Sequence, residues 1–157
     1  MIQCFTVIVL RIIIDADACP VTKIAVEIAK DKNIPAICVC DTSHFINGDY
    51  AEVIVVDKGA DSADLAVVNL CGEGDVVITQ DYGVASMALA KKSFVINQNG
   101  LCYTSDNIDY LMAMRHIAST ERRKSSKHHL KGPKKRTKDD DEKFVAAFTA
   151  LIEEKNV

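Results

Sequence analysis

The chain has 157 residues, of which 48% are hydrophobic and 26% are charged, and its formal net charge is −3. That length suits one domain with its own core, and the composition excludes collagen, low-complexity and wholly disordered classes. No apolar run reaches the roughly 18 residues of a membrane helix, and the apolar start lacks the basic region of a signal peptide. We therefore expect a cytoplasmic protein with no membrane partner.

Short apolar runs alternate with helical patterns along the chain. Strands are predicted at 12–14, 36–40, 53–56, 76–79 and 94–96. Helices are predicted at about 21–28, 61–71, 82–91, 105–116 and 138–154, the last preceded by Thr137 and Asp140 at capping-box spacing. Such alternation indicates a mainly parallel sheet covered on both faces. We predict a single α/β domain over residues 1–157, a three-layer α/β/α sandwich with about five strands.

Six cysteines lie at positions 4, 19, 38, 40, 71 and 102. Most of them fall within apolar stretches, and their spacing lacks the paired C-x2-C pattern of a zinc site. We expect reduced thiols packed in the core rather than disulfides or a structural metal.

Basic residues are concentrated in one segment. Residues 115–138 contain ten Lys or Arg and one Glu, which leaves nine basic and twenty-one acidic residues in the rest of the chain. The segment is either a solvated linker or a phosphate-binding arm for RNA or DNA. The residues that we assign to nucleic-acid contact are Arg122, Arg123, Lys124, Lys134, Lys135 and Arg136.

Polar side chains follow every predicted strand, at the edge where open parallel sheets bind their ligands. The acids there are Asp15, Asp17, Asp61, Asp64 and Asp81, and Asn97 and Asn99 follow the last strand. Carboxylates gathered at one edge repel one another, and a divalent cation removes that repulsion. Hard oxygen ligands select Mg²⁺ or Mn²⁺, either of which supports phosphodiester cleavage.

Several of these residues also have simpler structural interpretations. Asp61 is suited to capping its helix, and Asp64 to the positive end of the helix dipole. Lys58, beside Gly59, is either a phosphate ligand or a solvated turn lysine. His44 is either a proton donor or phosphate ligand, or a hydrogen-bonded loop histidine. Phosphate-binding motifs of the P-loop and G-x-G-x-x-G types are absent from the sequence, as is the G-x-S-x-G elbow.

Several long motifs in the same order resemble those of the bacterial YaiI/YqxD family, and the resemblance runs from about residue 11 to residue 148. The motifs are Ile14-Asp15-Ala16-Asp17-Ala18-Cys19-Pro20-Val21, Asp41-Thr42-Ser43-His44, Val56-Asp57-Lys58-Gly59-Ala60-Asp61-Ser62-Ala63-Asp64, Thr79-Gln80-Asp81-Tyr82-Gly83, Ile96-Asn97-Gln98-Asn99-Gly100 and Gly132-Pro133-Lys134-Lys135-Arg136. That family in turn resembles the PIN-like and NYN nuclease domains, which hold Mg²⁺ or Mn²⁺ with acids at the ends of parallel strands.

The resemblance implies roles for particular residues. Asp15, Asp81 and Asp61 or Asp64 would hold the metal, and we assign Asp15, Asp61 and Asp81 to it. Asp17 and Asp64 would ligate the metal or orient water. Where a PIN-type site carries a further acid, this chain has Asn97 and Asn99. That departure leaves open a one-metal site or a binding protein without turnover.

We therefore expect a metal-dependent nuclease that acts on RNA or DNA. One alternative is a non-catalytic RNA-binding or ribosome-associated module, which keeps the basic segment and treats the acids as structural. Another is a small-molecule phosphohydrolase of the D-x-D type. The sequence disfavours it, because Cys19 stands where a threonine is expected, two places beyond Asp17.

Overall fold

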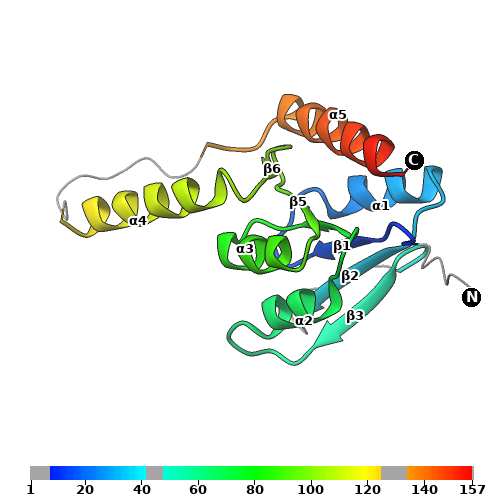
Figure 1. Ribbon diagram of the computed structural model, residues 1–157, viewed down its shortest axis with the longest axis horizontal. Helices are drawn as coiled ribbons and strands as arrows, with labels where there is room; N and C mark the ends of the chain where they lie inside the picture. Colours follow the sequence, from blue (N-terminus) through cyan, green and yellow to red (C-terminus); the bar gives the residue numbers. More distant parts are fainter. Residues whose placement is uncertain (1–7, 42–47, 125–133, 157) are drawn as a thin grey trace, which may run out of the picture.

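The computed structural model describes residues 8–41, 48–124 and 134–156, and it shows a three-layer α/β/α sandwich (Figure 1). The described residues form one six-stranded sheet in the order β3-β2-β1-β4-β5-β6. The strands are β1 Ile12–Asp15, β2 Ala36–Asp41, β3 Glu52–Val56, β4 Val76–Ile78, β5 Phe94–Ile96 and β6 Cys102–Tyr103. Every pair is parallel except β5 with β6. The predicted fold class is thus confirmed.

The five predicted helices are all present, with shifted ends. They are α1 Thr22–Asp31, α2 Ser62–Leu70, α3 Tyr82–Ala90, α4 Ile108–Lys124 and α5 Lys138–Lys155. The capping box before α5 is confirmed, because Asp140 N–H donates to Thr137 Oγ1 and Thr137 N–H donates to Asp140 Oδ2. The prediction ended α4 near residue 116, whereas the helix continues to Lys124 and includes the first part of the basic segment.

The sequence pattern missed the sixth strand. β6 has only two residues, too few for a period of two to be visible, and it pairs antiparallel with β5 after a tight turn. Asn97 closes this turn, since its Oδ1 accepts hydrogen bonds from the N–H groups of Asn99 (2.9 Å) and Leu101 (3.0 Å).

Two apolar cores lie on opposite faces of the sheet. On one face, Ile12 and Ile14 of β1 pack with α1 and α5, whose inward residues include Phe144 and Phe148. On the other face, Ile13 packs with α2, α3 and the first residue of α4. Consecutive strand residues alternate between the faces, so an unbroken apolar run such as that of β1 supplies both cores.

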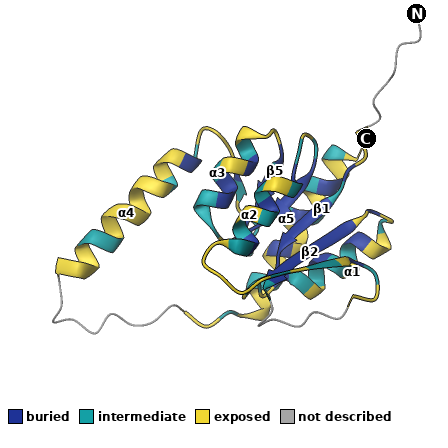
Figure 2. Cartoon of the chain, turned by 90° about the horizontal axis from the view of Figure 1, so that it is seen from below, coloured by how far each residue is buried: buried dark blue, intermediate teal, exposed yellow. Residues whose placement is uncertain are grey.

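Helix α4 extends away from the sheet (Figures 1 and 2), and beyond its first turn it lies beside the start of α3. Ile108 is its buried residue, while all of the following residues are exposed or half-buried. The five described cysteines are free thiols, three of them buried, as expected. Among the described residues, none of the helices is both long and apolar enough to span a membrane.

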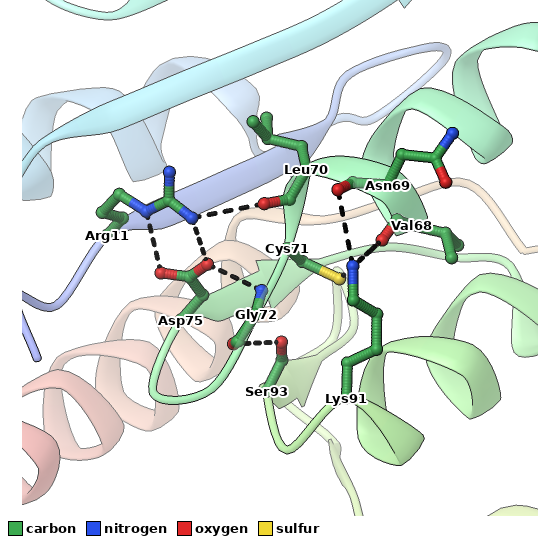
Figure 3. Close-up of polar contacts among 9 residues, drawn as sticks. All are labelled: Arg11, Val68, Asn69, Leu70, Cys71, Gly72, Asp75, Lys91 and Ser93. Carbon is green, nitrogen blue, oxygen red and sulfur yellow. Dashed lines mark hydrogen bonds and ion pairs between the residues drawn. The ribbon is translucent and has the colours of Figure 1, made fainter.

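A half-buried ion pair joins the start of β1 to the turn before β4 (Figure 3). Arg11 donates from Nε to Asp75 Oδ1 at 3.0 Å and from Nη2 to Asp75 Oδ2 at 2.6 Å. The same Nη2 reaches the carbonyl oxygen of Leu70 at 3.2 Å, and Lys91 Nζ reaches that of Val68, so two cations bind carbonyls at the C-terminal end of α2. The Asp75 side chain is only 4% exposed, whereas that of Arg11 is 36% exposed, so the carboxylate is the buried partner.

We expect Arg11→Met to lower the free energy of unfolding by about 2 kcal/mol, because it leaves a buried carboxylate without its cation while keeping an apolar stem. Urea unfolding measures the change. The matched control is Lys143→Met, which breaks an exposed pair with Asp139 and should cost about 0.5 kcal/mol or less. Equal effects of the two substitutions would show that the Arg11 pair contributes nothing beyond a surface contact.

Candidate functional site

The candidate site lies between β1 and β4, where the strand order reverses direction. From β1 the chain runs outward to β2 and β3, then crosses the other face to β4 and continues to β5. At such a point the connections leave in opposite directions, which opens a crevice at the carboxyl ends of the strands. Asp15 is the last residue of β1 and Thr79 follows the last residue of β4, so both side chains belong to this edge.

Asp15 is buried at this edge and is held by one hydrogen bond. The residue is 8% exposed, and its Oδ2 accepts a 2.8 Å hydrogen bond from the hydroxyl of Thr79. Burial raises the pKa of Asp15 from 3.8 to about 6. The Thr79 hydrogen bond lowers the pKa, and the negative charges of Asp64, Asp17 and Asp81 raise it further. The charges of these acids thus act on Asp15, and we call Asp15, Asp17, Asp64 and Asp81 the acidic cluster.

Of the two acids at the start of α2, it is the charge of Asp64, and not that of Asp61, that raises the pKa of Asp15. Asp64 lies in the first turn of α2, and its pKa is raised by burial and then by the charges of Asp81, Asp61 and Asp17. Asp61 acts on Asp64 but is not among the groups that shift the pKa of Asp15. It stands at the N-cap of α2 with φ of 61°, and its side chain caps none of the described N–H groups of that helix. Asp61 as a metal ligand stays a prediction, and the raised pKa of Asp64 favours Asp64 for that role.

The other two members of the acidic cluster also have structural contacts. Asp17 accepts hydrogen bonds from the backbone N–H of Asp41, at 3.0 Å to Oδ1 and 3.3 Å to Oδ2, which ties the β1 loop to the end of β2. Asp81 is the N-cap of α3, where its Oδ1 accepts from Val84 N–H at 2.9 Å. A cap of this kind uses one carboxylate oxygen and leaves the acid able to bind a second group.

Thr79 connects Asp15 to Asp81 and was given no role by sequence reasoning. Its fully buried hydroxyl donates to Asp15 and accepts from the backbone N–H of Asp81 at 3.1 Å. Its neighbour Gln80 donates from Nε2 to the carbonyl oxygen of Ala18 at 3.1 Å, so β4 also fastens the loop after β1. Ala18 has φ of 54°, a conformation costly for a residue with a side chain. In the sequence, the signal for this role of Thr79 is its position at the end of a predicted strand, shortly before an acid.

The donor type of the acidic cluster fits Mg²⁺ or Mn²⁺, although the arrangement is not a closed cage. In the described parts of the chain, no three His, Cys, Asp or Glu side chains are grouped closely enough to hold one ion. Mg²⁺ in proteins is commonly held by one or two carboxylates with several waters and a substrate phosphate. A cluster of repelling carboxylates around a buried acid matches that kind of site.

A cavity opens beside the cluster. It has a volume of about 290 Å³ and is lined by the starts of α2 and α3, including Asp61, Asp64, Asp81 and Gly83. A Cβ atom at Gly83 would lie 3.0 Å from Asp81 Oδ1, so glycine keeps the space beside that carboxylate open. The lining combines carboxylate oxygens with apolar side chains such as Leu65 and Met87. Such a cavity suits a ligand that has both a polar group and an apolar part.

Asn97, Asn99 and Arg136 form a structural network after β5. Asn97 holds its own turn, and Asn99 Oδ1 accepts from Arg136 Nη1 at 3.0 Å. Arg136 also donates to the Gln98 carbonyl oxygen at 2.7 Å and to Asp141 at 2.6 Å. These bonds attach the segment before α5 to the sheet edge, which explains these side chains without a ligand.

The remaining predicted phosphate ligands are exposed and spread along the molecule. Lys58 lies in the loop between β3 and α2, ahead of Asp61. Arg122, Arg123 and Lys124 form the last turn of α4, far from the sheet (Figure 1), while Lys134 and Lys135 precede α5. His44 and residues 125–133 of the basic segment lie outside the described residues.

Comparison with known proteins decides the family. The model of the uncharacterised YaiI/YqxD family matches residues 13–154. The chain belongs to that family. A UPF0178 protein of Clostridium acetobutylicum is 52% identical over 143 residues, covering 91% of this chain and 97% of the relative. UPF0178 proteins of Alkaliphilus oremlandii and Exiguobacterium sibiricum are 50% and 42% identical, over 92% and 93% of this chain and 92% and 99% of theirs.

No solved structure matches the chain. The resemblance to YaiI/YqxD proteins that the motifs indicated is thus confirmed, and the further resemblance to PIN-like nucleases stays a prediction.

The buried acid should make stability depend on pH in a chelating buffer. The folded-state pKa of Asp15, about 6, exceeds its usual value of 3.8, so the folded protein retains the proton longer than the unfolded chain does. The protonated Asp15 carboxyl contributes its full stabilisation below about pH 4, and that stabilisation is lost as the pH rises through 6. The free energy of unfolding changes by about 3 kcal/mol over this range. Asp15→Asn should therefore gain stability relative to the parent protein over that range, measured by urea unfolding at several pH values. Asp106→Asn, in the exposed turn before α4, controls for loss of one charge, and parallel curves for Asp15→Asn and the parent would contradict the expectation.

Proposed function

We propose that this protein is a divalent-metal-dependent nuclease that hydrolyses phosphodiester bonds in RNA or DNA. The observation that carries the proposal is Asp15, a carboxyl buried at the crossover of a parallel sheet whose pKa is raised by burial and by three neighbouring acids. A protein gains no stability from such an arrangement, which is typical of a site kept for function.

Asp15 and Asp64 are the residues that we assign to the metal, because each has a raised pKa and each is near other acids of the cluster. A bound Mg²⁺ or Mn²⁺ would stabilise the negative charge that develops on a phosphate during cleavage. Asp17 and Asp81, which already hold backbone N–H groups, would orient water molecules around the ion. The Thr79 hydroxyl fixes the orientation of the Asp15 carboxylate.

The charge distribution supports a polyanionic substrate. The chain places an acidic cluster at one sheet edge and a basic helix end on α4, with Lys58 in the loop that leads to α2. Lysine and arginine side chains bind the phosphates of nucleic acids without regard to base, so these residues would hold the polymer while the cluster acts on one bond.

Metal binding is the first test. Calorimetric titration with Mn²⁺ should give a binding isotherm for the parent protein and no detectable heat for Asp15→Asn, because the substitution removes one negative ligand from the cluster. Asp64→Asn should weaken binding at least about tenfold. Asp61→Asn is the informative comparison, because a loss of metal affinity equal to that of Asp64→Asn would show that Asp61 is a ligand. Asp106→Asn is the control for the loss of one charge.

Cleavage is the second test. Incubation of labelled RNA and DNA with Mn²⁺ or Mg²⁺ should yield products with the parent protein, and Asp15→Asn should reduce the rate at least about a hundredfold. Chelation should abolish cleavage in both. Cleavage that persists in Asp15→Asn would place the activity elsewhere or in a contaminant.

The non-catalytic RNA-binding module is the second candidate. It is favoured by one observation, namely that no three-ligand cluster occurs among the described residues. RNA binding that needs no metal, together with no cleavage under any of the conditions above, would decide for this alternative.

A further inference from the structure

We propose that the cavity between α3 and α4 is a phosphate subsite for single-stranded nucleic acid, with Arg115 and His116 as its ligands. The inference deepens the proposed nuclease function and rests on it for the identity of the polymer. It concerns residues that the acidic cluster does not use.

The cavity has a volume of about 350 Å³. One wall is the start of α3, residues 81–83, and the other is a face of α4 that presents Met112, Arg115, His116 and Ser119. The spacing of these four residues, i, i+3, i+4 and i+7, places them on one side of the helix. That side lines the cavity opposite the start of α3, with Met112, Arg115 and His116 still exposed, and residues 122–124 lie at the far end of the helix.

The cavity adjoins the candidate active site. Asp81 and Gly83 line both this cavity and the smaller one beside Asp61 and Asp64. The two cavities therefore meet at the start of α3. The smaller cavity has Asp61 and Asp64 on its far wall, and the larger one has Arg115 and His116. A polymer with a phosphate on each nucleotide can place one phosphate at the acidic cluster and a neighbouring one at Arg115.

Arg115 is held in position by an aromatic side chain. Its guanidinium carbon lies 5.3 Å from the centre of the Tyr82 ring, and Tyr82 packs edge-on against the buried ring of Tyr103 at 5.6 Å between centroids. The guanidinium group is planar and presents paired N–H donors, which match two phosphate oxygens at once. Stacking on Tyr82 orders this side chain before the ligand arrives and thus lowers the entropic cost of binding.

The shape of the site favours a single strand. Two adjoining cavities of about 290 and 350 Å³ between the ends of helices are of the size that accepts individual nucleotides. Beyond the cavity, α4 continues as an exposed helix that ends in three consecutive cations. A flexible strand can follow that helix from the cavity outward, and the bound phosphates along it would release counterions.

The test is the binding of fluorescently labelled RNA and DNA oligonucleotides, single-stranded and duplex, followed by anisotropy in EDTA and in Ca²⁺ at several salt concentrations. The double substitution Arg115→Gln with His116→Gln should weaken binding at least about tenfold. It should also make the plot of log K against log salt shallower by about 0.7 for each phosphate that the variant no longer neutralises. Lys30→Gln, on α1 at the other face of the sheet, removes one exposed cation as a matched control and should change neither quantity.

Two further measurements separate binding from folding and from catalysis. Arg115→Lys keeps the charge but loses the planar donors, so its binding should be intermediate, and circular dichroism should show unchanged helix content in every variant. Cleavage is measured on the same preparations, with Asp15→Asn as reference. If the double variant loses binding and the parent protein does not cleave either polymer, the result supports the subsite and rejects the nuclease.

Three results would overturn the inference. Binding by the double variant equal to that of Lys30→Gln rejects the subsite, while Asp15-dependent cleavage in the same samples would leave the nuclease proposal intact. Duplex bound as tightly as single strand rejects the single-strand preference. Failure of the parent protein to bind either oligonucleotide rejects the subsite altogether.

Discussion

The pairing of β1 with β4 is the constraint on which the rest of the structure depends. These two strands are far apart in sequence, and they meet at the centre of the sheet in the register Ile12 with Val76 to Ile14 with Ile78. The Arg11–Asp75 ion pair holds one end of the strand pair, and the Thr79–Asp15 hydrogen bond holds the other. Because both are side-chain interactions between the same two segments, a shift of register by one residue would break both and turn the apolar side chains of β1 to the wrong faces.

The two ends of this strand pair differ in their energetic character. At the Arg11 end a buried carboxylate has a cation and the N–H of Gly72 as partners. At the Asp15 end a buried carboxyl faces three other acids, so burial and repulsion raise its pKa. Left-handed backbone at Ala18 and Asp61 adds strain in the loops around that end. The repulsion between carboxylates therefore lies at the edge where parallel sheets bind ligands, and the ion pair lies at the opposite edge.

Helix α4 extends the same edge outward. Its first residue, Ile108, belongs to the core under α2 and α3, and the remainder of the helix is supported mainly by contact with the start of α3. An exposed helix of this length gains little from burial, so its sequence is free to carry charge, and α4 carries the cations Arg115, Arg122, Arg123 and Lys124. The described part of the molecule thus has the acidic cluster at one sheet edge and three cations at the outer end of α4.

The sequence by itself determined the five helices, five of the six strands and the fold class, because short apolar strands, helical periodicity and the capping box of α5 are local signals. Its motifs also indicated the family. It also indicated that Asp15, Asp17, Asp61, Asp64 and Asp81 share an edge, since every one ends or follows a parallel strand or opens the helix after it. Only the tertiary structure decided that Asp15 is the buried acid of this set. It alone brought Thr79 to Asp15, tied Arg136 to the β5 turn and set Arg115 over Tyr82. These contacts join segments distant along the chain, and their partners depend on how the strands are ordered and how the helices pack, which no local pattern encodes.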